Sequence, residues 1–176
     1  MNNKLPILAA LLLLISNSLI GQESFKEKFK SYRTFSEFDL YFSGGVGEPP
    51  INRGGVTFAL GKQIKDEFSC SLLLGLEVFP KYNKDRPYMY STMLMPVGLN
   101  FKRYFVSNPR LIPHLSLDIG CSIPTTNGGF FVIPAVGLGI GNIKFQLGYC
   151  LQQFTPRGSD KEEILSAAQI KVGFFF

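Results

Sequence analysis

The sequence has no tryptophan and a single histidine, and only 18% of its 176 residues are charged. One histidine cannot build a zinc site, and no spacing of other ligands indicates a metal or a cofactor. The charged fraction lies below the ~25% of an average soluble domain. The formal net charge is only +5 and the basic residues are spread along the chain, so a nucleic-acid partner is not indicated.

Cysteine is also scarce. The three cysteines, Cys70, Cys121 and Cys150, are odd in number and far apart, so they predict no disulfide framework. We expect them to act as small apolar side chains on strands. A single disulfide between two of them is the alternative.

No apolar run after residue 22 is long enough for a membrane-spanning helix. Residues 1–22 have the pattern of a secretory signal peptide, with Lys4 before an apolar core over residues 5–15. We predict cleavage near Gly21 and Gln22. Residues 23–34 are then expected to form an N-terminal periplasmic segment, either a short amphipathic helix or a frayed tail.

From residue 35 onward, apolar and polar residues alternate with the period of a β-strand. Eight such segments are predicted, at residues 35–43, 53–62, 67–79, 88–105, 112–121, 130–141, 143–154 and 164–176. Long and short connections take turns between them, as in a membrane barrel whose two rims face different compartments. Residues 35–176 are therefore predicted to form an all-β fold, an eight-stranded antiparallel up-and-down transmembrane β-barrel. Pro96 predicts a bulge or a weak pairing point in the fourth strand.

The polar face of these segments carries too little charge to be a water-exposed exterior. The acidic and basic residues on this face are nearly equal in number, which suits a narrow lumen where buried charges must pair. The predicted lumen charge network is Glu37, Asp39, Glu77, Lys102, Asp118, Lys144 and Lys171. Closure would bring Lys171 towards Glu37 or Asp39, and Lys102 lies on the strand next to Asp118. The alternative is a secreted lipocalin-like lipid carrier, whose apolar face would point inward.

Aromatic residues gather near both ends of the predicted strands. The row beside the long loops is Phe42, Phe79, Tyr82, Tyr88, Phe130, Phe131 and Phe154. The opposite row is Phe35, Phe38, Phe68, Tyr104, Phe105 and Phe176. Two such rows match the two interfaces of a bilayer.

The whole pattern resembles the small bacterial outer-membrane barrels of the OmpA/OmpX type and is most similar to the short PorT-like barrels of Bacteroidetes. The resemblance is carried by the segment Ile20, Gly21 and Gln22, by the eight strands, and by the final strand over residues 169–176. It implies outer-membrane localisation, contact with membrane lipid and lipopolysaccharide, and assembly by the outer-membrane machinery. Phe174 and Phe176 would be the assembly signal. No single activity and no protein partner follow, because the fold hosts many functions.

His114 and Ser116 are the sequence's only candidates for catalysis, since His-x-Ser resembles the deacylases of lipid A. Asp118 faces the same way. Residues two apart on a strand stand side by side and need not aim at each other. A lipid A-modifying hydrolase is therefore kept as the alternative to a non-enzymatic barrel.

The predicted outer loops carry basic residues that could bind the phosphates of lipopolysaccharide. Lys81, Lys84 and Arg86 lie in one loop, with Arg53 and Arg157 in others. An open channel is not expected, because eight strands leave an interior that side chains fill. The leading prediction is a non-enzymatic barrel with a structural or surface-interaction role through its extracellular loops.

Overall fold

The structure is a computed structural model that describes residues 32–46, 52–64, 67–78, 93–105, 111–123, 129–154 and 163–176. The predicted signal peptide lies outside these residues, as do Lys81, Lys84, Arg86 and Arg157. Within the described ranges there is no helix long and apolar enough to cross a membrane.

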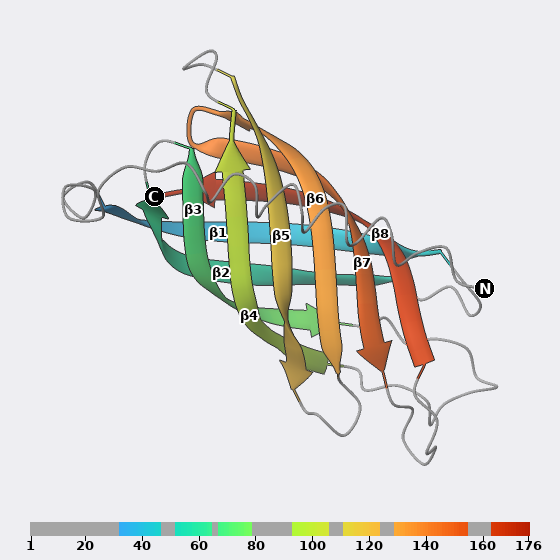
Figure 1. Ribbon diagram of the computed structural model, residues 1–176. Helices are drawn as coiled ribbons and strands as arrows, with labels where there is room; N and C mark the ends of the chain where they lie inside the picture. The colour runs from blue at the N-terminus through green and yellow to red at the C-terminus, as the bar shows by residue number, and fades with distance from the viewer. Residues whose placement is uncertain are drawn as a thin grey trace, which may run out of the picture. The chain divides into compact units, whose positions relative to one another are not determined.

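Eight antiparallel strands close into a barrel in chain order (Figure 1). They are β1 (Tyr32–Gly45), β2 (Arg53–Ile64), β3 (Phe68–Val78), β4 (Met93–Tyr104), β5 (Ile112–Ile123), β6 (Phe130–Ile140), β7 (Ile143–Phe154) and β8 (Glu163–Phe175). Each strand pairs with the next, and β8 pairs with β1. The predicted closed eight-stranded antiparallel barrel is confirmed.

The first strand begins earlier than the alternation indicated. β1 starts at Tyr32 rather than Phe35, because Tyr32 and Thr34 pair with Ile64 and Lys62 of β2. The last three residues assigned to the N-terminal segment therefore belong to the barrel.

The β6–β7 connection is the tightest turn described. Gly141 has a φ of 58°, in the left-handed region that glycine adopts without steric cost. It is followed by Asn142, and Ile140 pairs directly with Ile143. A two-residue loop of glycine and asparagine is typical of tight β-hairpins.

The strands are strongly staggered. Paired residues can be followed from strand to strand around the barrel, starting at Ser36 of β1. The path runs through Ser36, Leu60, Leu72, Leu99, Ile119, Val132, Leu151, Ser166 and Val46. Val46 lies just past the end of β1, so the path returns to the first strand ten residues after its starting point. The last step is a hydrogen bond of 2.8 Å from the Val46 N–H to the Ser166 carbonyl oxygen. Such a stagger tilts the strands, and a barrel of eight strands is just narrow enough to be filled by side chains.

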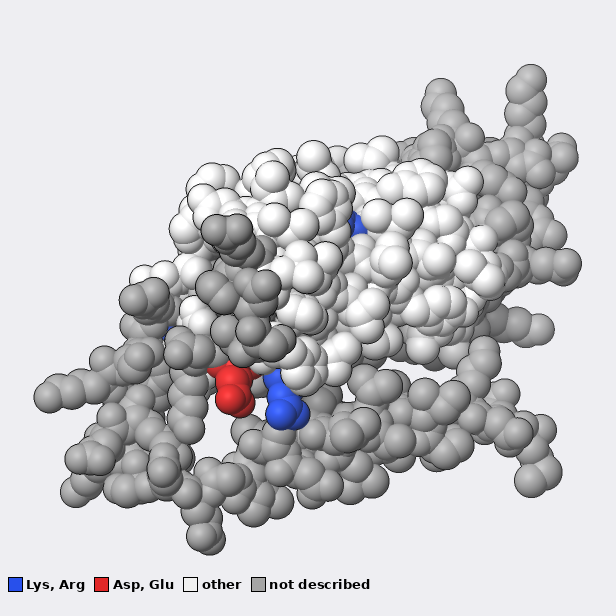
Figure 2. Space-filling view, turned by 90° about the horizontal axis from the view of Figure 1, so that it is seen from above, with Lys and Arg blue, Asp and Glu red and all other residues white. Residues whose placement is uncertain are grey.

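The two faces of the barrel wall differ in polarity. Large apolar side chains are exposed on the outer face, including Leu60 at 55%, Leu147 at 61% and Ile170 at 55%. The face of the described barrel seen in Figure 2 is almost entirely uncharged, apart from a red and a blue patch near one edge and small blue spots elsewhere. Charged residues instead fill the interior, where Lys144 is completely buried.

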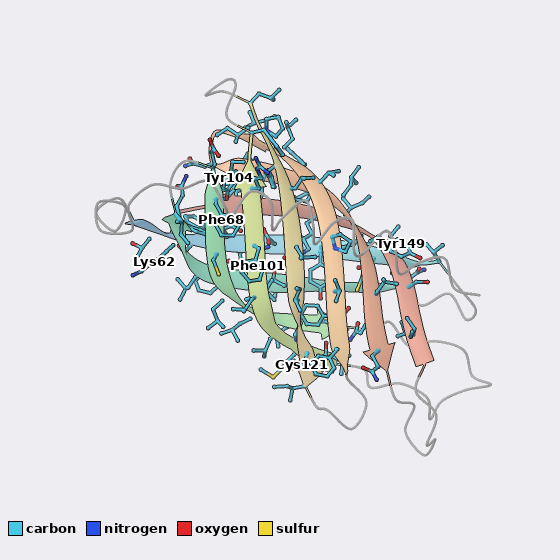
Figure 3. The ribbon with its side chains drawn as sticks, viewed as in Figure 1. Lys62, Phe68, Phe101, Tyr104, Cys121 and Tyr149 are labelled. Atoms are coloured by element: carbon cyan, nitrogen blue, oxygen red, sulfur yellow. The ribbon has the colours of Figure 1, made fainter. Side chains whose placement is uncertain are left out.

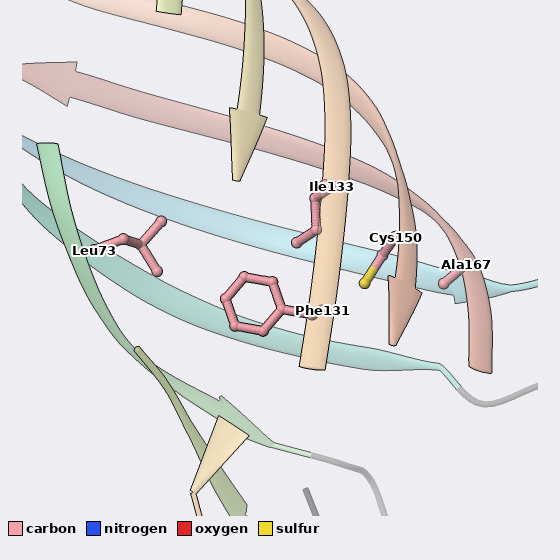
Figure 4. Close-up of a cluster of buried hydrophobic side chains, with 5 residues drawn as sticks. All are labelled: Leu73, Phe131, Ile133, Cys150 and Ala167. Carbon is pink, nitrogen blue, oxygen red and sulfur yellow. The ribbon is translucent and has the colours of Figure 1, made fainter. Parts of the chain in front are cut away.

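One apolar cluster interrupts this polar interior. It consists of Leu73, Phe131, Ile133, Cys150 and Ala167, from β3, β6, β7 and β8 (Figure 4). Phe131 was expected in the outer aromatic row, and this prediction is wrong, since its ring is only 3% exposed. The inward face of β6 changes from Phe131 and Ile133 near the long loops to Gly137 and Gly139 near the short turns. The His114 and Gln146 side chains fill the space beside Gly137.

Tyr104 was also expected in an aromatic row and instead faces the interior. The Ser69 hydroxyl donates a hydrogen bond of 3.4 Å to the Tyr104 hydroxyl, and the Tyr104 ring lies 5.7 Å from that of His114. Phe35 shares the inward parity of Glu37 on β1. The outward aromatic residues near this end include Phe68, Phe105 and Phe176.

Pro96 interrupts the pairing of β3 and β4. The register runs from Leu74 and Val97 to Glu77 and Leu94, with no ladder pair for the two positions between. Proline has no N–H to donate to the ladder. The weak pairing point predicted at Pro96 is present.

Candidate functional site in the barrel interior

The interior near the short turns holds a compact group of charges, which we call the Glu37 cluster: Glu37, Asp39, Lys102 and Lys144. The ammonium groups of Lys102 and Lys144 both donate to Oε2 of Glu37. Lys144 Nζ also lies 2.8 Å from Oδ1 and 3.1 Å from Oδ2 of Asp39. All four side chains are at most 6% exposed. The Glu37 carboxylate thus contacts both buried lysines, and Asp39 supplies a second carboxylate to Lys144.

Two residues of β8 adjoin this cluster: Gly173 leaves room for its side chains, and the ring of Phe175 packs against its lysines. Gly173 pairs with Asp39 on one side and Lys144 on the other. A Cβ at position 173 would overlap the Asp39 carboxylate and the Lys144 side chain. The ring of Phe175 lies 5.6 Å from Lys102 Nζ and 5.3 Å from Lys144 Nζ, in the range of cation–π contacts.

A second group lies across the middle of the lumen. Asp118 accepts hydrogen bonds from Lys171 and from Asn100. The expected approach of Lys171 to Glu37 or Asp39 does not occur. The β1–β8 register places Lys171 opposite Tyr41, further towards the long loops. Lys102 likewise turns to Glu37 instead of Asp118, because Asn100 occupies the position opposite Asp118.

The interior near the long loops holds a third group. Arg53 was assigned to a solvent-exposed loop, which is wrong, since it is 1% exposed and its Nε lies 3.1 Å from Oε1 of Glu77. Its guanidinium also donates to Gln152 Oε1 and to Cys150 Sγ, the latter at 2.9 Å. Gln152 in turn donates a 2.9 Å hydrogen bond to the Ser122 hydroxyl. Arg53 is the first residue of β2, and its parity with Gly55 and Thr57 is the signal that would have placed it inside.

The described interior is therefore electrically balanced. It contains four acidic residues and four basic residues: Glu37, Asp39, Glu77 and Asp118, with Arg53, Lys102, Lys144 and Lys171. A cavity of about 20 Å³ lies beside Glu77, Asp118 and Lys171 and is also lined by Tyr41, Leu73, Cys150 and Gln169. This is room for about one water molecule. The described interior can hold charge and water, and this cavity is too small for an organic substrate.

His114 and Ser116 are both buried in the lumen and are linked through a third residue. Gln146 Nε2 lies 2.9 Å from His114 Nε2 and donates a 3.1 Å hydrogen bond to the Ser116 hydroxyl. His114 Nδ1 lies 3.4 Å from the Ile112 carbonyl oxygen, so we assign its proton to Nδ1. Asp118 is paired with Lys171. An amide therefore stands where catalysis needs a direct contact between serine and histidine.

The remaining predicted site residues lie on the wall. Phe174 and Phe176 face outward, 38% and 78% exposed, and Phe176 exchanges backbone hydrogen bonds of 2.9 and 3.1 Å with Ser36. Cys70, Cys121 and Cys150 are free thiols. Among the described residues, no group of His, Cys, Asp and Glu is arranged to hold a metal ion.

The fold places this chain in the class of small up-and-down β-barrels. It is a closed eight-stranded antiparallel barrel with paired charges inside and aliphatic side chains outside. The chain is similar to the crystal structure of Neisserial surface protein A (NspA), with a TM-score of 0.54, 10% identity, and coverage of 83% of this chain and 98% of that one. It also aligns with the N-terminal β-barrel domain of Pseudomonas aeruginosa OprF (TM-score 0.47, 16% identity, 83% of this chain and 100% of that one). A de novo designed transmembrane β-barrel aligns with a TM-score of 0.45 and 9% identity over 80% of this chain and 95% of that one.

The sequence matches no protein-family profile and no curated protein. The likeness to NspA shows the fold alone.

Proposed function

We propose that this chain is a non-enzymatic outer-membrane β-barrel protein that acts through its extracellular loops. The observation that carries the proposal is the inverted polarity of the barrel wall. Leu147, Leu60 and Ile170 are more than half exposed, whereas Lys102 and Lys144 are at most 1% exposed. Lipid is the solvent that stabilises such an exterior, because exposed aliphatic side chains are favourable there and charges are not.

The height of the apolar band supports a membrane location. The outward residues of β3 are apolar from Phe68 to Val78, a distance of ten residue steps. Ten steps rise roughly 33 Å, and a tilt near 40° reduces this to about 25 Å. An outward apolar band of about 25 Å is what transmembrane barrels present to lipid.

The polarity of the interior argues against the lipocalin-like alternative. A soluble carrier would line its lumen with apolar side chains and leave a cavity for the ligand. Here the lumen contains the Glu37 cluster and the Arg53–Glu77 pair, and its cavity has room for about one water.

The interior also argues against the hydrolase alternative. His114 is 2% exposed and Gln146 separates it from Ser116. Neither residue faces the lipid that a lipid A deacylase would act on. We therefore assign His114 and Ser116 a structural role in the lumen.

The finer parts of the proposal rest on the sequence pattern. Residues 1–22 act as the export signal, Phe174 and Phe176 guide assembly by the outer-membrane machinery, and the chain is a relative of the PorT-like barrels of Bacteroidetes. Lys81, Lys84 and Arg86 form the loop surface that meets lipopolysaccharide phosphates.

Fractionation tests the membrane location. The protein should stay in the outer-membrane fraction after a carbonate wash and migrate differently on gels before and after boiling. Release by carbonate would contradict the proposal. For the enzymatic alternative, lipid A from overexpressing cells should keep all its acyl chains. A loss of acyl chains that disappears in the His114→Ala variant would establish a hydrolase instead.

A further inference from the structure

The outer wall of the barrel carries its charges at one end. Among the described side chains, the charged ones that lie outside the interior are Lys62, Glu67 and Arg103, all at the short-turn end. At the long-loop end, the polar outward side chains that the structure describes are uncharged, such as Gln153 and Ser166. The two rims of the wall therefore present different chemistry to a bilayer.

Lys62 and Arg103 lie on either side of a pair of aromatic rings. Lys62 on β2 pairs with Cys70 on β3, which pairs with Phe101 on β4. Phe68 pairs with Arg103 in the next row. The Phe68 and Phe101 rings are stacked, with centroids 6.4 Å apart and planes 26° from parallel. We call these five residues the rim patch, and Figure 3 shows Lys62, Phe68 and Phe101 at the same end of neighbouring strands.

The spacing of the cations suits one phosphate group. β2 and β4 are separated only by β3, and Arg103 lies two residues along β4 from Phe101, which shares the row of Lys62, so the backbones at Lys62 and Arg103 are about 12 Å apart. Lysine and arginine side chains are long and carry their charge at the tip, so the two cations can reach one phosphate held over the small Cys70 side chain. The Arg103 guanidinium lies 5.5 Å from the centroid of the Phe105 ring, a contact that holds it at the rim.

We propose that the rim patch binds the headgroup of an anionic phospholipid in the periplasmic leaflet. The proposal rests on the proposed membrane function, since short turns face the periplasm in such barrels. Lys62 and Arg103 bind the phosphate, as an ammonium and a guanidinium do at other phosphate sites. The Phe68 and Phe101 rings pack against the upper acyl chains, which continue over Leu72 of β3.

The charges of the rim indicate the kind of headgroup. Glu67 is exposed beside the patch, and its carbonyl oxygen accepts a 2.8 Å hydrogen bond from the Tyr104 N–H. The two cations of the rim patch suit the single phosphate of a headgroup such as phosphatidylglycerol.

The absence of native tryptophan allows a local measurement. The Phe68→Trp variant places one fluorophore in the rim patch. The matched control is Phe145→Trp, an outward position near the short turns on β7, across the barrel, that pairs with Leu138 and Val172. Each variant is refolded into phosphatidylcholine vesicles containing 20% phosphatidylglycerol (a chosen composition), with bromine on the acyl chains of one lipid or the other.

We expect brominated phosphatidylglycerol to quench the Phe68→Trp fluorophore more strongly than its fraction of the vesicle lipid predicts. It should quench the Phe145→Trp fluorophore in proportion to that fraction. A cation beside an anionic surface contributes roughly a fivefold enrichment. Adding Lys62→Gln and Arg103→Gln together should return the Phe68→Trp variant to the control value. Lys62→Arg with Arg103→Lys should keep most of the enrichment.

Equal quenching at the two positions would overturn the headgroup site, as would enrichment that survives the double Gln substitution. In matched vesicles that contain lipid A in place of phosphatidylglycerol, stronger quenching by brominated lipid A than by brominated phosphatidylglycerol would overturn the choice of lipid. Failure of the variants and of the unmodified chain to insert, seen as no heat-modifiable form in any vesicle, would instead count against the proposed membrane function.

Discussion

The two ends of the barrel interior are filled in different ways. Near the short turns, Lys102 and Lys144 share one carboxylate of Glu37, and the neighbouring β6 wall is glycine. Near the long loops, a single Arg53–Glu77 pair lies beside the apolar cluster of Leu73, Phe131, Ile133, Cys150 and Ala167.

The two ends differ in the number of partners that each buried cation has. Arg53 has three partners from different side chains, since Glu77, Gln152 and Cys150 all contact its guanidinium. Lys102, by contrast, has Glu37 as its carboxylate partner among the described residues. Loss of one acidic residue should therefore be more damaging at the short-turn end than at the long-loop end.

The largest effect is expected from Glu37→Gln, which sharpens this comparison. It leaves Lys102 without a carboxylate and Lys144 with Asp39 alone. Leaving a buried charge unpaired costs about 3–5 kcal/mol of the free energy of unfolding. Urea unfolding of the barrel in lipid vesicles measures it, and a loss below about 1 kcal/mol would show that the cluster is not a closed network.

Gly173→Ala should give a smaller but clear loss at the same end. The new Cβ would overlap the Asp39 carboxylate and the Lys144 side chain. Overpacking of this kind costs about 1–3 kcal/mol. Gly139→Ala is the matched control, since the nearest atom to its Cβ is the Ile112 carbonyl oxygen at 3.6 Å, and its stability should be nearly unchanged. Equal losses for the two variants would contradict the packing described.

Glu77→Gln tests the long-loop end and should cost less than Glu37→Gln. Arg53 keeps its contacts with Gln152 and Cys150. The expected loss in the same unfolding experiment is about 1–3 kcal/mol, the cost of one lost charge-assisted hydrogen bond. A loss larger than that of Glu37→Gln would reverse the comparison between the two ends.

The smallest effect is expected from Ser116→Ala. Its hydroxyl accepts one hydrogen bond from Gln146, and Gln146 keeps its contact with His114. The loss should be about 1 kcal/mol in the unfolding free energy. The acyl-chain pattern of lipid A should not change. A change in that pattern with unaltered stability would support the hydrolase instead.

The barrel was predictable because alternation is a local signal. Phe145 and Leu147 alternate with Lys144 and Gln146 along a single strand, and this shows two faces without any knowledge of the partner strands. Period-two patterns of this kind, repeated with long and short connections in turn, were sufficient to predict the closed antiparallel barrel.

The contacts inside were less predictable, because they depend on stagger. Lys171 faces inward, but the ten-residue offset around the barrel carries it to Asp118 and away from Glu37. Phe131 and Arg53 were misplaced for another reason. In this barrel a polar residue is expected to face the lumen and an apolar one the outside. Phe131 is an apolar residue on the inward face, and Arg53 is a charged residue at the first position of a strand, so neither follows this rule.

Site-directed spin labelling of β5 in vesicles tests the central claim most directly, with Cys70, Cys121 and Cys150 first replaced by alanine. Nitroxides at Leu115, Leu117 and Ile119 should collide frequently with oxygen dissolved in the lipid, and those at Ser116 and Asp118 should be shielded from oxygen and from a water-soluble nickel reagent. Lack of this alternation, or access of the nickel reagent to Leu117, would show that the apolar face of the wall does not meet lipid.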